Sequence, residues 1–108
     1  MADKKIYYKL VRDKIPEIIT SADKIANTTI IDDDDFYFKS LCTKLMEEKA
    51  ELEESRSPEE LADVLEVVYA IADFLGLNLD ELEQIRKEKA DKRGGFKERI
   101  FLESVETK

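Results

Sequence analysis

Four carboxylates stand at helical spacing on either side of a short turn. Glu48 and Glu51 are three residues apart before the turn, and Glu60 and Asp63 are three residues apart after it. Residues with this spacing lie on one face of a helix, so each pair can direct its oxygens to one point. Oxygen ligands suit Mg²⁺ best, then Mn²⁺, with Ca²⁺ as a third candidate. The spacing therefore predicts a divalent-cation site between two helices.

The hydrophobic pattern places these carboxylates where apolar side chains are expected. On a helical wheel, Glu48 falls in the middle of an apolar stripe and Glu51 lies on its flank. Glu60 and Asp63 lie in the first turn of the following helix. They begin an apolar stripe of this helix, which continues with Val64, Val67, Ala70, Ile71 and Phe74. Buried carboxylates repel one another or take up protons unless a cation neutralises them. A structural alternative for Glu60 is that it closes a capping box with Ser57.

Two helices joined by a tight turn must position these residues. The first should cover about residues 35–54, preceded by aspartates that suit the start of a helix. The second should cover residues 58–75, with Ser57 as its cap and Gly76 as a left-handed terminator. So short a turn makes the helices antiparallel neighbours and keeps both carboxylate pairs within about 10 Å of it. The second helix is apolar nearly all round, which predicts burial on both sides, in a core or between subunits.

Weaker elements surround this hairpin. A further helix should follow an Asn78 cap with Glu81 at the capping-box position, and the pair Gly94 and Gly95 should end it. A short helix should begin near an Asp13 cap. The segments "KIYYKLVRD", "IANTTII" and "FKERIFLESV" have strand-like composition or alternation. The predicted fold is thus mainly α, an antiparallel helical hairpin or bundle, with a minor β component from the terminal segments.

Composition limits the possible chemistry. The 108 residues, 43% hydrophobic and 41% charged, suit one helix-rich domain spanning residues 1–108. The chain has no histidine, and Cys42 is its only cysteine. These facts exclude histidine catalysis, thiolate metal cages and an internal disulfide. The net charge of −8 argues against a nucleic-acid polymer as partner. We find neither a membrane-length apolar run nor a secretory signal, and we expect a cytoplasmic protein.

Three segments in this order resemble the MazG-type all-α nucleoside triphosphate pyrophosphohydrolases. They are "YKLVRDKIPEII", "KLMEEKAELEES…EELADVLEV" and "IRKEKADKRGGF", and together they span nearly the whole chain. The motif "EEKAE" is similar to the family's E-E-x-x-E element, and "EELAD" is similar to its E-x-x-D element. The wider pattern resembles the subgroup called phosphoribosyl-ATP pyrophosphohydrolase-like. The stretch between the two elements is shorter here than in many members of the family.

The resemblance implies an activity and a set of roles. It implies Mg²⁺ held by Glu48, Glu51, Glu60 and Asp63, with Glu47 as a further member. It also implies dimers or tetramers and hydrolysis of a nucleotide between its α and β phosphates, which releases pyrophosphate. Glu48 or Glu51 could then act as the catalytic base. We expect phosphate-binding cations, because negative charge grows during cleavage; the candidates are Arg86, Lys89, Lys92 and Arg93, followed by Arg12 and Lys14.

Three functions remain open at this point. A house-cleaning enzyme would hydrolyse a non-standard nucleoside triphosphate. A histidine-biosynthesis enzyme would cleave phosphoribosyl-ATP. A non-catalytic helical dimerisation module would use the doubly apolar second helix for contacts and carry the carboxylates only as an acidic surface. The last alternative predicts no thermal shift with divalent cations, whereas both enzymes require one.

Overall fold

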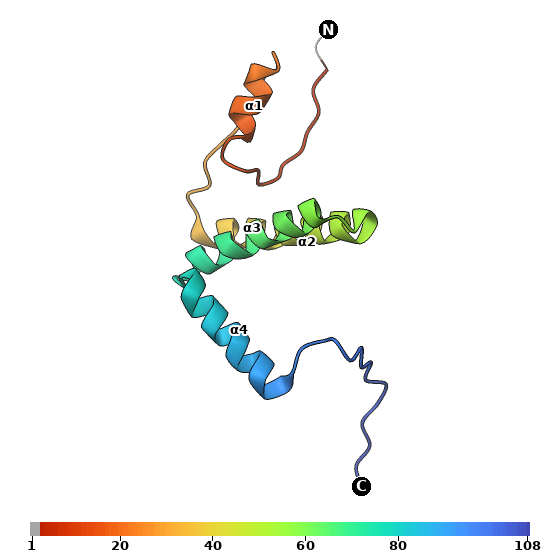
Figure 1. Cartoon of the computed structure of the whole chain (residues 1–108). Helices are drawn as coiled ribbons and strands as arrows, with labels where there is room; N and C mark the ends of the chain where they lie inside the picture. Colours follow the sequence, from red (N-terminus) through yellow and green to blue (C-terminus); the bar gives the residue numbers. More distant parts are fainter. Residues whose placement is uncertain (1–2) are drawn as a thin grey trace.

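The computed structural model describes residues 3–108, and these residues form four helices (Figure 1). The helices are α1 (Ile15–Ser21), α2 (Asp34–Ser55), α3 (Pro58–Phe74) and α4 (Leu79–Arg93). In Figure 1, α2 and α3 lie side by side, whereas α1 and α4 point away from this pair. The prediction of a mainly α protein is confirmed.

Local signals set most of the helix ends. The side chain of Asp33 accepts a hydrogen bond from the backbone N–H of Asp35 at 3.1 Å, so an aspartate caps α2 as expected. Gly76 has φ +78°, the left-handed conformation predicted for the residue after α3. The expected Asp13 cap of α1 is wrong. Lys14 occupies that position without a side-chain bond, and the backbone carbonyl of Arg12 accepts from the first helical N–H instead.

The packed part of the structure is the hairpin of α2 and α3. Its buried apolar residues are Leu41 from α2 together with Val67 and Ala72 from α3. At the end away from the turn, the ring of Phe74 lies 5.3 Å from that of Phe38 and 5.7 Å from that of Tyr37, measured between centroids. These aromatic contacts hold α2 and α3 together at the open end of the hairpin, opposite the turn.

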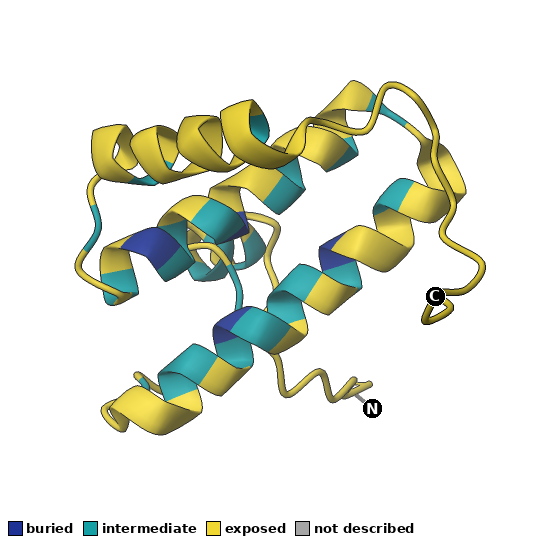
Figure 2. Ribbon diagram, turned by 90° about the horizontal axis from the view of Figure 1, so that it is seen from below, coloured by how far each residue is buried: buried dark blue, intermediate teal, exposed yellow. Residues whose placement is uncertain are grey.

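Beyond the hairpin the chain spreads out. Its Cα radius of gyration is 18.8 Å and its longest dimension is 69 Å, whereas a compact domain of this length has a radius of gyration of about 13 Å. Figure 2 shows that most of α4 is exposed, as are residues 3–9 and 94–108. Within residues 3–108, α4 approaches α3 near their shared turn and does not approach α2. None of the helices in this range has the length and apolar character needed to cross a membrane.

The minor β component is not confirmed, because no strand occurs within residues 3–108. A strand needs a partner for its backbone groups, and the three strand-like segments have none in this part of the chain. In two of these segments the backbone also leaves the extended conformation, at Tyr8 with φ 44° and at Arg99 with φ 59°. The composition of these three segments favoured strands, but the segments have no sheet in which to pair.

Candidate metal centre

The turn between α2 and α3 determines how the carboxylates meet. Arg56 ends α2 in the left-handed conformation with φ 53°, and its N–H donates to the carbonyl of Leu52 at 2.8 Å. Ser57 then caps α3 by accepting from the N–H of Glu60 at 3.2 Å, and Pro58 opens the first turn. The chain thus reverses within two residues, and the last turns of α2 face the first turns of α3.

Three of the predicted ligands converge at this end of the hairpin. Glu48 from α2 and Glu60 and Asp63 from α3 each offer a carboxylate oxygen, and these oxygens lie within 4.8 Å of one another. We call these residues the carboxylate triplet. Glu48 is only 7% exposed. Its Oε2 and the Oε2 of Glu60 are both buried without a hydrogen-bond partner. Buried charged oxygens without partners are costly, so a ligand for them is expected here.

Glu60 is free to belong to the triplet because it does not complete a capping box. Its backbone N–H bonds to Ser57, but the backbone N–H of Ser57 donates to the hydroxyl of Ser55 at 3.3 Å. The start of α4 shows the contrast. There Asn78 and Glu81 exchange both bonds, at 2.8 and 3.2 Å, and the predicted capping box is present. The structural alternative for Glu60 is therefore wrong, since its carboxylate turns to the triplet.

Electrostatics in the triplet favour either protonation or a bound cation. Burial raises the pKa of Glu48, and the nearby Glu51 adds to this effect although Lys44 opposes it. The pKa of Glu60 is also raised, first by desolvation and then by Glu51, Asp63 and Glu48. Glu51 itself is exposed and lies outside the triplet, close enough to act on both groups. Glu51 therefore borders the triplet next to Glu48 and Glu60, and its role as a ligand stays a prediction.

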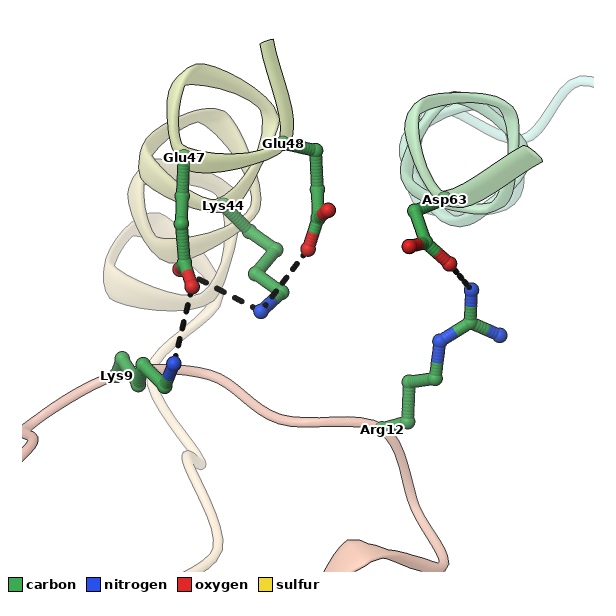
Figure 3. A network of polar contacts seen from close by, with 6 residues as sticks. All are labelled: Lys9, Arg12, Lys44, Glu47, Glu48 and Asp63. Atoms are coloured by element: carbon green, nitrogen blue, oxygen red, sulfur yellow. Dashed lines mark hydrogen bonds and ion pairs between the residues drawn. The ribbon is translucent and has the colours of Figure 1, made fainter. Parts of the chain in front are cut away.

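Glu47 and three basic side chains lie beside Glu48 and Asp63 of the triplet (Figure 3). Lys44 lies 3.3 Å from Glu48 and 3.4 Å from Glu47. Glu47 also accepts from Lys9 at 3.0 Å. Desolvation would raise the pKa of Glu47, but Lys9 and Lys44 outweigh it and lower this pKa. Glu47 is therefore fixed by cations beside the triplet.

Arg12 is the one predicted phosphate-binding residue that reaches this region. Its Nη2 donates to Oδ1 of Asp63 at 2.7 Å. Sequence reasoning missed Lys9 and Lys44 altogether. The spacing of Lys44, four residues before Glu48, could have revealed it as an ion-pair partner. Nothing in the local sequence links Lys9 to α2.

The other predicted phosphate-binding residues lie elsewhere. Arg86, Lys89 and Arg93 line an open hollow of about 440 Å³ at the end of α4, together with Ala90, Gly94, Gly95 and Phe96. Arg86 pairs with Glu83 at 2.8 Å. Lys92 is an exposed residue of the last turn of α4, and Lys14 is the exposed N-cap of α1. This chain does not bring the basic groups of α4 to the carboxylates, because α4 leaves from the opposite end of α3.

The donor set fits a hard divalent cation. Every donor is a carboxylate oxygen, which Mg²⁺, Mn²⁺ and Ca²⁺ accept and softer metals do not prefer. Five carboxylates, Glu47, Glu48, Glu51, Glu60 and Asp63, face three basic groups, Lys9, Arg12 and Lys44. One such ion would balance the excess of two negative charges. The two buried oxygens without partners give that ion a place to bind.

Comparison of the whole chain with protein-family models, curated proteins and solved structures finds no match.

Proposed function

We propose that this protein is an Mg²⁺-dependent nucleotide pyrophosphohydrolase that cleaves the bond between the α and β phosphates of a non-standard nucleoside triphosphate. The observation that carries the proposal is the carboxylate triplet, with two buried oxygens that lack partners. The resemblance of three sequence segments to MazG-type enzymes supports the choice of substrate. Mg²⁺ takes oxygen ligands, and in many nucleotide-hydrolysing enzymes it is bound by carboxylates together with substrate phosphates; the triplet supplies the carboxylates.

In this mechanism the residues of the chain have separate tasks. Glu48, Glu60 and Asp63 would hold the ion, which supplies charge neutralisation for the phosphates and the attacking water. Glu51 is the preferred base, because it is exposed beside the triplet and not a member of it. It takes the proton of a water molecule as the water oxygen attacks phosphorus. The bond to the leaving phosphate breaks, and a monophosphate and pyrophosphate are formed.

The same proposal includes a homo-oligomer, either a dimer or a tetramer. An apolar stripe of α3 and its C-cap is open to solvent, with Leu61 56% exposed, Leu65 46% and Leu75 58%. Among residues 3–108 few apolar side chains are buried, and the radius of gyration exceeds that of a compact domain. A second copy packed on this stripe would supply the missing core. Light scattering at micromolar concentration should give at least twice the mass of one chain.

We place the activity in the cytoplasm, where nucleoside triphosphates are made and used. The lone Cys42 suits a reducing compartment. Phosphoribosyl-ATP is the alternative substrate within the enzyme class, and a non-catalytic helical module is the alternative outside it. The open stripe of α3 would serve that module equally well, so oligomerisation alone does not separate the two.

A pyrophosphate-release screen tests the function. Purified protein is incubated with standard and non-standard nucleoside triphosphates and with phosphoribosyl-ATP, each with Mg²⁺ or with a chelator. We expect release from a triphosphate only with Mg²⁺, and a loss of roughly 10²-fold or more in Glu51→Gln. Asp73→Asn, which removes an exposed carboxylate near the other end of α3, is the matched control. Faster turnover of phosphoribosyl-ATP would reverse the order of substrates, and no release from any compound would refute the enzyme.

A further inference from the structure

The N-terminal segment crosses the hairpin beside the carboxylate triplet and contacts both of its helices. Lys9 reaches Glu47 of α2 at 3.0 Å, and Arg12 reaches Asp63 of α3 at 2.7 Å. Figure 3 shows the two side chains rising from one stretch of chain toward different helices. Leu10 and Val11, between them, are partly buried. The segment therefore places one cation against each helix of the hairpin, at the end that carries the triplet.

Neither cation is saturated by its carboxylate partner. Within residues 3–108, Arg12 donates a side-chain hydrogen bond only to Asp63, through one nitrogen, while a guanidinium carries five N–H donors. Its side chain is 54% exposed, and that of Lys9 is 37% exposed. Ion pairs this exposed contribute little to stability, so stability alone is a weak reason for both cations to be here. Their remaining donors can bind a second anion next to the triplet.

We propose that Lys9 and Arg12 bind the phosphate chain of the substrate at the carboxylate triplet, so that the N-terminal segment forms the phosphate clamp. This inference rests on the proposed function for the identity of the substrate. The two residues are three positions apart, which corresponds to roughly 10 Å of extended chain. That span allows contacts with different phosphates of one polyphosphate. A guanidinium also matches phosphate oxygens in a bidentate manner, as it matches a carboxylate.

Charge balance supports the clamp. One divalent ion would cancel the excess negative charge of the carboxylates and basic groups around the triplet. A polyphosphate would then bring several further negative charges that need partners. An ion bound to Asp63 weakens the hold of this carboxylate on Arg12, which frees the guanidinium for phosphate. The backbone of residues 9–12 is not helical, so these side chains can adjust without unwinding a helix.

The location of the other basic residues also favours this segment. Arg86, Lys89 and Arg93 line their own hollow on α4, which leaves from the far end of α3. Lys44 is 16% exposed and already lies between Glu47 and Glu48. Among the basic residues around the triplet, Lys9 and Arg12 are the ones with substantially exposed side chains.

The test measures binding of inorganic tripolyphosphate in saturating Mg²⁺ by calorimetry, using the full-length chain. We expect Arg12→Gln and Lys9→Gln each to weaken binding about tenfold or more, and Arg12→Lys to restore part of the affinity. Lys39→Gln is the matched control, because Lys39 is an exposed cation of α2 whose partner is Asp35. Its affinity should equal that of the wild type. Binding of Mg²⁺ alone, followed by thermal shift, should be at least as tight in Arg12→Gln as in the wild type.

Each outcome decides the inference. It is supported if Arg12→Gln loses tripolyphosphate but keeps Mg²⁺, and if KM for the nucleotide rises more than kcat falls. It is overturned if tripolyphosphate does not bind the wild type, if both variants bind it normally, or if only Arg86→Gln weakens binding. Equal loss of Mg²⁺ and tripolyphosphate would assign Arg12 a purely structural role and also overturn it. A wild type that binds Mg²⁺ and tripolyphosphate but hydrolyses no nucleotide would refute the proposed enzyme and not the clamp.

Discussion

Replacing Glu48 by Gln separates a metal ligand from an ordinary buried carboxylate. Glu48 is 7% exposed and has one buried oxygen without a partner. The amide keeps the shape of the side chain and removes its charge. Without divalent cations we expect Glu48→Gln to melt at the same temperature as the wild type or higher. Burial raises the pKa of Glu48, which means that the charged form is disfavoured there, and Lys44 keeps its contact with Glu47.

With Mg²⁺ the order of stability should reverse. An ion present at a hundred times its dissociation constant stabilises the folded wild type by about 2.7 kcal/mol. For a chain of this size that corresponds to a shift of roughly 10 °C in the melting temperature. If loss of one carboxylate weakens binding at least tenfold, the same Mg²⁺ concentration stabilises Glu48→Gln by about 1.4 kcal/mol or less.

Differential scanning fluorimetry with an Mg²⁺ titration, repeated with a chelator, measures both effects. Asp73→Asn serves as the control and should show the full wild-type shift, since this exposed carboxylate lies outside the triplet. Equal Mg²⁺ shifts in the wild type and Glu48→Gln would refute the assignment of Glu48 as a ligand. No shift in the wild type would refute the metal centre and would favour the non-catalytic helical module.

Three further predictions concern pH, the core and the turn. The raised pKa values of Glu48 and Glu60 mean that, in chelator, their contribution to stability is complete below the ordinary glutamate pKa and is lost as the pH rises through the raised values; melting curves from pH 4 to 8 should show this decline, and added Mg²⁺ should reverse it. Leu41→Ala removes a side chain that is 3% exposed and should cost about 2–3 kcal/mol in urea unfolding, whereas the exposed control Met46→Ala should change stability by less than about 0.5 kcal/mol. Arg56→Gly relieves a left-handed residue with φ 53° and should add about 0.5–1 kcal/mol, with a lower melting temperature counting against strain at this position.

The hairpin could be predicted because its signals are local. Ser57, Pro58 and Gly76 stand next to the turns that they define, and each acts through backbone groups only a few residues away. The carboxylate triplet could also be predicted, since residues three apart share a helix face and a short turn brings the two faces together. A helical wheel gives a direction but not how far a side chain reaches, so it did not distinguish Glu51, which borders the triplet, from the three members.

The remaining parts of the site depend on contacts between distant residues. Lys9 and Arg12 come from a segment without helical periodicity, so no local pattern indicates that it docks on α2 and α3. The role of Glu60 depends on the hydroxyl of Ser55, which takes the Ser57 N–H that a capping box would have used. The strand-like segments depend on a partner for their backbone groups, and composition does not supply one.

The members of the carboxylate triplet all fall within residues 48–63, on two helices joined by a reversal of the chain. Such closeness along the sequence means that little loop entropy opposes their assembly. A synthetic peptide covering residues 34–74 would contain the triplet, its turn and the aromatic contacts at the far end. This peptide should therefore bind the cation, but it would lack the phosphate clamp of the N-terminal segment.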